Sequence, residues 1–180
     1  MEQVIVHGKV FERFISAADI AIKVKELGKK LNQLYRNSEP PLILGILNGS
    51  FIFMADLIRE LEFECTVQFI RIESYQGLQT TGVVKMEMDV SKKWSGQHVI
   101  LVEDIVDTGH TLNRFYPVLQ SYQPKSIFMS ALLFKEEALE VEVKLDHYCF
   151  KIPKHFVVGY GLDYDGLGRN LHEIYKLAAS

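Results

Sequence analysis

Short apolar runs alternate along the chain with segments of helical periodicity. Four runs are continuous enough to predict strands buried on both faces of a sheet. They are residues 42–47, 66–72, 99–102 and 127–134. Three other segments carry apolar side chains at helical spacing. They are residues 20–34, 51–61 and 112–119. Strands that alternate with helices in this way predict an α/β fold with a mainly parallel central sheet flanked by helices.

Local signals predict where several elements begin and end. Ser16, followed by Asp19, is typical of a helix N-cap, and the two prolines at 40–41 end the helix that follows. The apolar positions on one face of this helix are Ile20, Val24, Leu27, Leu31 and Leu34. Before the helix, residues 3–11 alternate loosely and predict a short strand.

The last third of the chain is less regular. Residues 148–152 and 156–162 predict strands on either side of Pro153. Residues 136–145 fit either a short helix or a loop. The apolar positions within residues 163–180 predict a packed segment of undefined secondary structure.

We expect a single domain over residues 1–180. Its core would span about 14–135. The segments at about 1–13 and 136–180 would form a small cap, or hood, across one edge of the sheet. With 48% apolar and 24% charged residues, the chain has enough apolar side chains to bury a core.

Charge and cysteine usage narrow the range of partners and compartments. The formal charge of −3 argues against a nucleic-acid partner. The sequence contains no long apolar span and no secretory leader, so we expect a cytoplasmic protein without a membrane partner. Cys65 and Cys149 show no metal-binding or redox spacing, which predicts free thiols in a reducing compartment.

The most informative stretch follows the apolar run at residues 99–102. The acids Glu103, Asp104 and Asp107 come first, followed by Thr108, Gly109 and Thr111 at the start of a helix. A glycine turn, hydroxyl groups and the unpaired N–H groups of a helix start together form a cradle for an anion. Carboxylates repel an anion, so their presence indicates a sugar phosphate, which offers hydroxyls to the acids and a phosphate to the cradle. The alternative is an ordinary strand–turn–helix with a solvated acidic loop.

Other segments fall where they would meet this stretch. The turn at residues 48–50 and Lys135 both follow predicted parallel strands, and ligands bind beyond the carboxyl ends of such strands. Residues 74–82 carry two glycines and no core pattern, which is typical of a lid loop, and residues 84–88 alternate like a half-exposed strand. The alternatives are a plain connection at 48–50, a solvated lysine at 135 and a surface hairpin at 74–88.

The stretch from residue 99 to residue 111 resembles the phosphoribosyl-diphosphate (PRPP) signature of the type I phosphoribosyltransferases. The resemblance rests on the order of residue types along this stretch. Two apolar pairs are followed by Glu103-Asp104, then by two further apolar residues, and then by Asp-Thr-Gly-His-Thr. Matches in the right order extend it over nearly the whole chain, to the hypoxanthine (hypoxanthine-guanine) phosphoribosyltransferases. They are residues 47–57, Ser74-Tyr75, residues 81–82, Lys135, residues 156–164 and Arg169.

The resemblance implies a type I phosphoribosyltransferase fold with a hood, and a purine salvage activity. Such an enzyme transfers the 5-phosphoribosyl group from PRPP to N9 of hypoxanthine or guanine. The products are IMP or GMP and pyrophosphate. The resemblance also implies Mg2+ as cofactor, a cytoplasmic location and a homodimer or homotetramer.

The resemblance assigns a role to each matching residue. Asp107 would be the general base, with Ser74 and Tyr75 on the lid. The residues expected to bind the ribose and its phosphate are Glu103, Asp104, Asp107, Thr108, Gly109, His110 and Thr111. Those expected to bind pyrophosphate are Asn48, Gly49 and Arg169, and those expected to bind the purine are Lys135, Phe156, Val157 and Asp163. Asp163 would also bind the metal, and Lys135 would donate to the purine O6.

Two alternatives and two departures accompany this assignment. The chain could be a regulatory PRPP- or nucleotide-binding protein of the same fold without turnover. It could also be a xanthine-guanine or pyrimidine phosphoribosyltransferase. The family usually has lysine at the position of Asn48, and often lysine or arginine at that of His110. The resemblance places a non-proline cis peptide at Asn48–Gly49.

Overall fold

The structure is a computed structural model, and it describes residues 2–72 and 94–178. Its elements follow one another in the order expected for alternating strands and helices. They are β1 (Gln3–Val6), β2 (Lys9–Ile15), α1 (Ala17–Tyr35), β3 (Leu42–Leu47), α2 (Phe51–Arg59), β4 (Thr66–Arg71), β5 (His98–Val106), α3 (His110–Ser121), β6 (Ser126–Phe134), the 3-10 turn η1 (Glu136–Ala138), β7 (His147–Lys151), β8 (Val157–Val158) and β9 (Ile174–Leu177).

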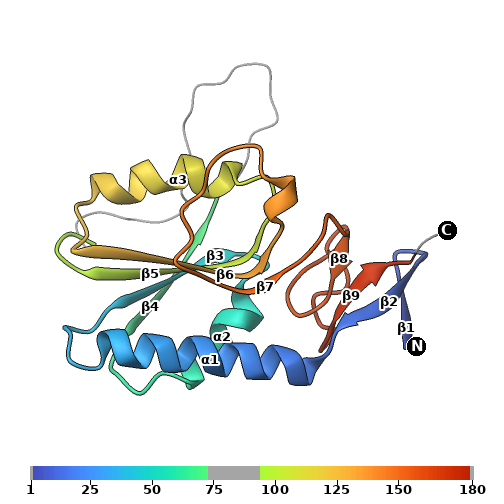
Figure 1. The fold of residues 1–180 in the computed structure, drawn as a ribbon, viewed down its shortest axis with the longest axis horizontal. Helices are drawn as coiled ribbons and strands as arrows, with labels where there is room; N and C mark the ends of the chain where they lie inside the picture. Colours follow the sequence, from blue (N-terminus) through green and yellow to red (C-terminus); the bar gives the residue numbers. More distant parts are fainter. Residues whose placement is uncertain (1, 73–93, 179–180) are drawn as a thin grey trace.

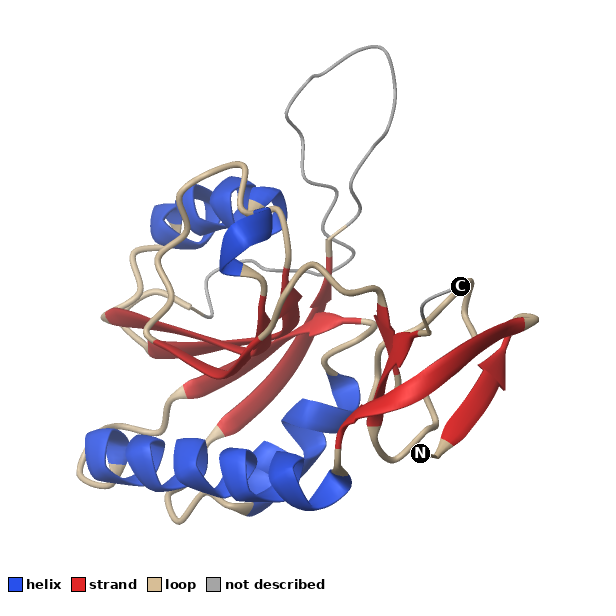
Figure 2. Ribbon diagram, turned by 45° about the vertical axis from the view of Figure 1, so that its right-hand side comes forward, coloured by secondary structure: helices blue, strands red, loops and turns tan. Residues whose placement is uncertain are grey.

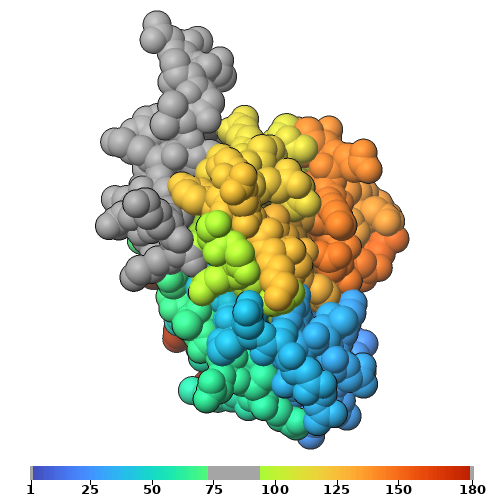
Figure 3. Space-filling model, turned by 90° about the vertical axis from the view of Figure 1, so that its left-hand side faces the viewer, coloured from blue at the N-terminus to red at the C-terminus, as the bar shows by residue number. Residues whose placement is uncertain are grey.

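A five-stranded sheet in the order β4-β3-β5-β6-β7 forms the centre of the molecule. Each neighbouring pair in it is parallel. Helices α1 and α2 cover one face and α3 covers the other (Figures 1 and 2). The prediction of a mainly parallel sheet flanked by helices is therefore confirmed. The carboxyl ends of the strands point toward the smaller sheet, and Figure 3 shows the opposite end of the molecule.

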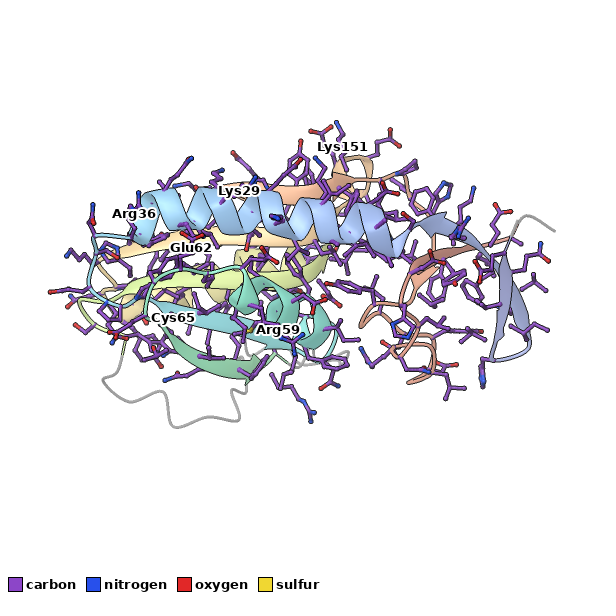
Figure 4. All side chains as sticks on the ribbon, turned by 90° about the horizontal axis from the view of Figure 1, so that it is seen from below. Lys29, Arg36, Arg59, Glu62, Cys65 and Lys151 are labelled. Carbon is purple, nitrogen blue, oxygen red and sulfur yellow. The ribbon has the colours of Figure 1, made fainter. Side chains whose placement is uncertain are left out.

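Helix α1 begins where its cap predicts. The side chain of Ser16 accepts a hydrogen bond from the backbone N–H of Asp19 at 3.1 Å. The expected apolar face is buried as far as Leu31. The last core position then belongs to Tyr35, whose ring packs against Phe63 and His98, while Leu34 is 55% exposed. Figure 4 shows this helix lying beneath the sheet beside α2.

Apolar side chains fill the space on both faces of the central sheet. One cluster lies between the sheet and helices α1 and α2, and a second lies between the sheet and α3. Trp94 belongs to the second cluster and donates through Nε1 to the side chain of Gln68 at 3.1 Å. Two packed layers around one sheet give the carboxyl ends of the strands a rigid base.

A second, antiparallel sheet in the order β1-β2-β9-β8 stands at the carboxyl edge of the central sheet. We call this sheet, with the segment 159–173 between β8 and β9, the hood. The structure divides the expected strand at residues 3–11 into a hairpin. His7 and Gly8 form its turn with positive φ angles of 50° and 74°.

The boundary of the hood differs from the expected one. Strand β7 pairs with β6 in the central sheet, so residues 136–151 belong to the core and not to the hood. The expected strand at residues 156–162 is also wrong beyond its first residues. The chain leaves β8 through positive φ angles at Gly159, Tyr160 and Gly161, which a strand does not tolerate. Within residues 136–145 the structure has only the turn η1 as a helical element.

Both cysteines are free thiols, as their spacing predicted. Cys149 is buried, and burial raises the pKa of its thiol to about 12. Burial also raises the pKa of Cys65, which lies just before β4 (Figure 4). Neither environment favours the reactive thiolate. Among the helices of the described residues, none is long and apolar enough to cross a membrane.

Candidate active site

The acids Glu103 and Asp104 lie within the last residues of β5, and not in a loop after residue 102 as expected, and they are in a desolvated environment. The side chain of Glu103 is buried, and its Oε2 has no hydrogen-bond partner among the described residues. Burial, together with the neighbouring charge of Asp104, raises the pKa of Glu103 well above its usual range. Burial also raises the pKa of Asp104 to about 6. An acceptor that is buried and unpaired is unfavourable unless a ligand donates to it.

The turn between β3 and α2 comes into direct contact with these acids. A Cβ atom on Gly49 would lie 1.4 Å from Oδ2 of Asp104, so only glycine fits there. The carbonyl of Gly49 is covered in turn by Gly161, where a Cβ would lie 2.1 Å from that oxygen. Three segments far apart in sequence therefore meet at this point. The cis peptide lies at Leu47–Asn48, one residue before the expected position.

The predicted anion cradle forms the start of α3. Gly109 turns the chain with a φ of 86°, and its carbonyl accepts from the N–H of Asn113 at 3.0 Å. Its neighbours Thr108, His110 and Thr111 lie on the same turn, at the positive end of the helix dipole. The first N–H groups of a helix have no partner within the helix. These residues thus lie together in a geometry suited to a phosphate.

Lys135 and Asp107 form an ion pair next to this cradle. Nζ of Lys135 lies 2.7 Å from Oδ2 of Asp107. The backbone N–H of Lys135 also donates to the carbonyl of Val106, which holds the ends of β5 and β6 together. The lysine side chain is 9% exposed and the aspartate 48%, so the carboxylate faces outward and the ammonium lies behind it.

Asp163 and Arg169 come from the hood and close the acidic side of the site. Nη2 of Arg169 lies 2.6 Å from Oδ1 of Asp163, and Nη1 donates to the carbonyl of Gly161 at 2.7 Å. The backbone N–H of Gly166 donates to the other oxygen of Asp163 at 2.7 Å. The charge of Asp163 adds to the rise in the pKa of Asp104, whereas Arg169 lowers it. Both hood residues therefore lie within electrostatic range of Asp104 in β5.

The chemistry of this donor set fits Mg2+. Carboxylate oxygens are the hard donors that Mg2+ prefers, and one or two of them suffice because substrate phosphates and waters complete the octahedron. A cation would also relieve the repulsion between Asp104 and Asp163. The described residues contain no group of three or more acidic, histidine or cysteine side chains placed to hold a metal by themselves. These carboxylates thus fit a Mg2+ ion that is also bound by the phosphates of a substrate.

Phe156 and Val157 lie where the hood meets the central sheet. Val157 is buried in β8 and pairs with Lys176 of β9. The ring of Phe156 is 47% exposed, and its centroid lies 5.3 Å from that of Tyr164 and 6.1 Å from that of Phe11. The aromatic contacts fix one side of this ring and leave surface for stacking. Ser74 and Tyr75 fall outside the described residues, as do the expected lid at 74–82 and the strand at 84–88.

The structure also places three residues beside the site that sequence reasoning did not select. Gly161 could have been found, because closely spaced glycines often mark a close backbone approach. Arg71 ends β4 next to the end of β3, and its Nη2 donates to Oδ1 of Asn48 at 3.1 Å. Glu140 lies 2.8 Å from Nε2 of His110. The last two contacts depend on strand register and loop path, which leave no local signal.

A family model for the phosphoribosyl transferase domain matches residues 15–165. The chain belongs to this phosphoribosyl transferase family. A hypoxanthine-guanine phosphoribosyltransferase of Aquifex aeolicus is 37% identical over 96% of this chain and 97% of its own length. A hypoxanthine phosphoribosyltransferase of Escherichia coli is 40% identical over 92% of this chain and 94% of its own.

Solved structures show the same phosphoribosyl transferase fold. A hypoxanthine-guanine phosphoribosyltransferase of Bacillus anthracis has a TM-score of 0.85 and 36% identity, covering 93% of this chain and 98% of its own. A hypoxanthine phosphoribosyltransferase of Staphylococcus aureus has a TM-score of 0.86 and 36% identity, covering 93% and 91%. The match extends over both sheets, so the hood belongs to the shared fold as well as the core.

Proposed function

We propose that this phosphoribosyl transferase transfers the 5-phosphoribosyl group of PRPP to N9 of hypoxanthine or guanine, giving IMP or GMP and pyrophosphate. The observation that carries the proposal is the ion pair between Lys135 and Asp107, at the end of β5 between its acids Glu103 and Asp104 and the phosphate cradle. It brings a donor for a purine carbonyl and a base for a purine proton to one place. The names of the relatives support the same reaction in purine salvage.

The purine would lie between the ends of β5 and β6 and the hood. Lys135 donates to O6, an acceptor that adenine lacks, so a single positioned cation favours 6-oxopurines. Asp107 accepts the proton from N7 or N9 as the new bond forms at C1 of the ribose. Phe156 stacks on the ring, and Val157 and Asp163 offer backbone groups to the remaining edge of the base.

The ribose phosphate would lie across the turn after β5. Glu103 and Asp104 accept hydrogen bonds from the ribose hydroxyls, which gives the buried Oε2 of Glu103 a donor. The 5-phosphate lies in the cradle of Thr108, Gly109 and Thr111 and of His110 beside them. These contacts hold the sugar in place while C1 moves from the pyrophosphate to the base.

The pyrophosphate would lie at the turn between β3 and α2. The backbone N–H groups of Asn48 and Gly49 would donate to it, and Arg169 would supply a positive charge. Asp163 would hold Mg2+ together with the ligand. When bound, Mg2+ offsets the negative charge that develops on the leaving pyrophosphate. Ser74 and Tyr75 would help to exclude water from the reacting carbon.

The proposal includes a cytoplasmic enzyme that works as a homodimer or homotetramer. Exposed apolar side chains on the outside of the core, such as Phe51 and Val67, offer surface for a second copy. Light scattering after gel filtration measures the oligomer directly. A monomer over the working range of concentration would contradict this part.

A panel of bases tests the proposed reaction. Hypoxanthine, guanine, xanthine, adenine and uracil are each supplied with PRPP and Mg2+, and the nucleotide formed is measured. We expect turnover of hypoxanthine and guanine and none of adenine. Binding of PRPP or nucleotide without turnover of any base would favour the regulatory alternative. Preference for xanthine or for uracil would assign the chain to one of the other transferases.

A further inference from the structure

The segment 139–143, which follows η1, is packed against the phosphate cradle. The backbone N–H of Glu140 donates to the carbonyl of Thr108 at 3.0 Å. A Cβ on Gly109 would lie 2.5 Å from Cγ2 of Val143, so this segment closes the outer side of the turn. One turn further along α3, Nδ2 of Asn113 donates to the carbonyl of Glu142 at 3.3 Å. The cradle and this segment therefore form one unit.

The carboxylate of Glu140 faces the first residue of α3. Its Oε2 lies 2.8 Å from Nε2 of His110. The two side chains are 64% and 43% exposed, so both can be reached from solvent. The start of a helix attracts anions, and this carboxylate already places a negative charge there. Nothing in the proposed reaction assigns Glu140 a part.

We propose that Glu140 is a positioning residue that weakens the hold of the cradle on a 5-phosphate and so eases the release of nucleotide. This inference rests on the proposed function. Glu140 acts through His110, because the imidazole can donate from Nε2 either to the carboxylate or to the phosphate. Its negative charge also opposes the phosphate directly, by the same interaction that draws anions to the helix start.

The expected size of the effect follows from the exposure of the pair. Ion pairs between exposed side chains contribute little and are screened by salt. Removing the charge of Glu140 should therefore change nucleotide affinity by a factor of about two to five at low ionic strength. An effect of this size is enough to alter turnover where product release limits the rate.

The test compares Glu140→Gln with Glu142→Gln, by calorimetric titration with GMP and with guanosine. Glu142 is a matched control, because it lies on the same segment, is exposed and contacts α3 through its main-chain carbonyl. We expect Glu140→Gln to bind GMP about two to five times more tightly, to bind guanosine unchanged, and to lower the KM for PRPP without raising kcat. Glu142→Gln should resemble the wild type.

A second pair of variants tests whether the effect passes through His110. In a His110→Ala background, Glu140→Gln should tighten GMP binding less than it does in the wild type. Equal GMP affinity for wild type and Glu140→Gln, or an equal gain in both glutamine variants, would overturn the inference. A wild type that binds GMP and turns over bases would then leave the proposed function standing. A wild type that does neither would overturn both.

Discussion

Nζ of Lys135 donates to Oδ2 of Asp107 at 2.7 Å. The lysine side chain is 9% exposed, and the aspartate side chain is 48% exposed. The ammonium group is thus reached past the acid. In the proposed reaction a purine carbonyl would bind another of the three N–H donors of this ammonium group, beside Asp107. The shared ammonium group would couple base recognition to Asp107, the proposed general base, because a carbonyl bound to it weakens its hold on the carboxylate.

Replacement of Asp107 by asparagine tests its role as base. We expect Asp107→Asn to lower kcat by about 10²–10⁴, because asparagine keeps the shape but cannot take a proton. Binding of PRPP should remain close to wild type in a fluorescence or calorimetric titration. Asp165→Asn is the control, because Asp165 is an exposed aspartate on the hood that pairs with His7. Loss of PRPP affinity with an unchanged rate would reassign Asp107 to sugar binding.

Replacement of Lys135 tests base recognition separately. Lys135→Gln removes a charged donor, and hydrogen bonds to charged groups contribute about 1.5–3 kcal/mol. The KM for hypoxanthine and guanine should therefore rise by roughly 10- to 150-fold, with the KM for PRPP little changed. Lys151→Gln is the matched control, because this lysine is half exposed on β7 and pairs with Glu136. An equal rise in the KM for the purine base and in the KM for PRPP would indicate a general loss of structure.

The sequence predicted those parts of the fold and the site that depend on local pattern. The cap at Ser16, the apolar runs that became β3 and β6, and the turn from Asp107 to His110 all appear where their side chains indicated. Each of them is determined by residues within one or two turns of chain. The strand order was not accessible in this way, so β7 was expected in the hood although it completes the central sheet.

A close approach between the backbone of Gly49 and the side chain of Asp104 gives a third prediction. A Cβ on Gly49 would lie 1.4 Å from Oδ2 of Asp104, so Gly49→Ala must displace that carboxylate. We expect a loss of stability of more than about 2 kcal/mol and weakened PRPP binding. Gly96→Ala is the control. Gly96 has a φ of 72° and no atom within 4 Å of an added Cβ, so only its backbone conformation is strained. Its stability should fall by about 1 kcal/mol, with binding unaffected.

The acidity of Asp104 gives the fourth prediction. Its pKa of about 6 lies above its ordinary value of 3.8, so the folded chain binds this proton more tightly than the unfolded chain. Stability of the unliganded protein should therefore fall as pH rises from about 4 to 6, by up to about 3 kcal/mol, and stay low above that range. Asp104→Asn should flatten this slope and raise the melting temperature at pH 7.5. An unchanged slope in urea titrations would show that other groups cause it.

Asn48 gives the fifth prediction. Asn48→Lys adds a positive charge at the turn proposed to bind pyrophosphate, and we expect a lower dissociation constant for pyrophosphate and a lower KM for PRPP. The gain in affinity should be modest, because Arg71 lies against this position and the two cations would repel each other. It should be lost at high salt, because salt screens the added charge. If neither constant changes at low salt, position 48 does not face the pyrophosphate.

The path of the hood and its contacts with the core could not be predicted from local sequence patterns. Residues 156–162 look like a strand because most of them are apolar, but positive φ angles at Gly159, Tyr160 and Gly161 turn this segment back on itself. Gly161 thereby reaches Gly49, and Tyr160 donates to Asp56 of α2 at 2.7 Å. These contacts join parts of the chain that share no periodicity. Their pairing becomes visible only when the backbone path is known.

The pairing of β2 with β9 has a consequence for how the molecule is made. Phe11 lies opposite Leu177, so this sheet joins two strands from opposite ends of the described chain. The central sheet needs no residue beyond Lys151. Asp163 and Arg169 take their places only with the later sheet, and contacts of such long sequence separation form slowly. The cluster beneath the central sheet also needs Val157, Tyr160 and Ile174, so the chain completes its core and its proposed active site in the same late step.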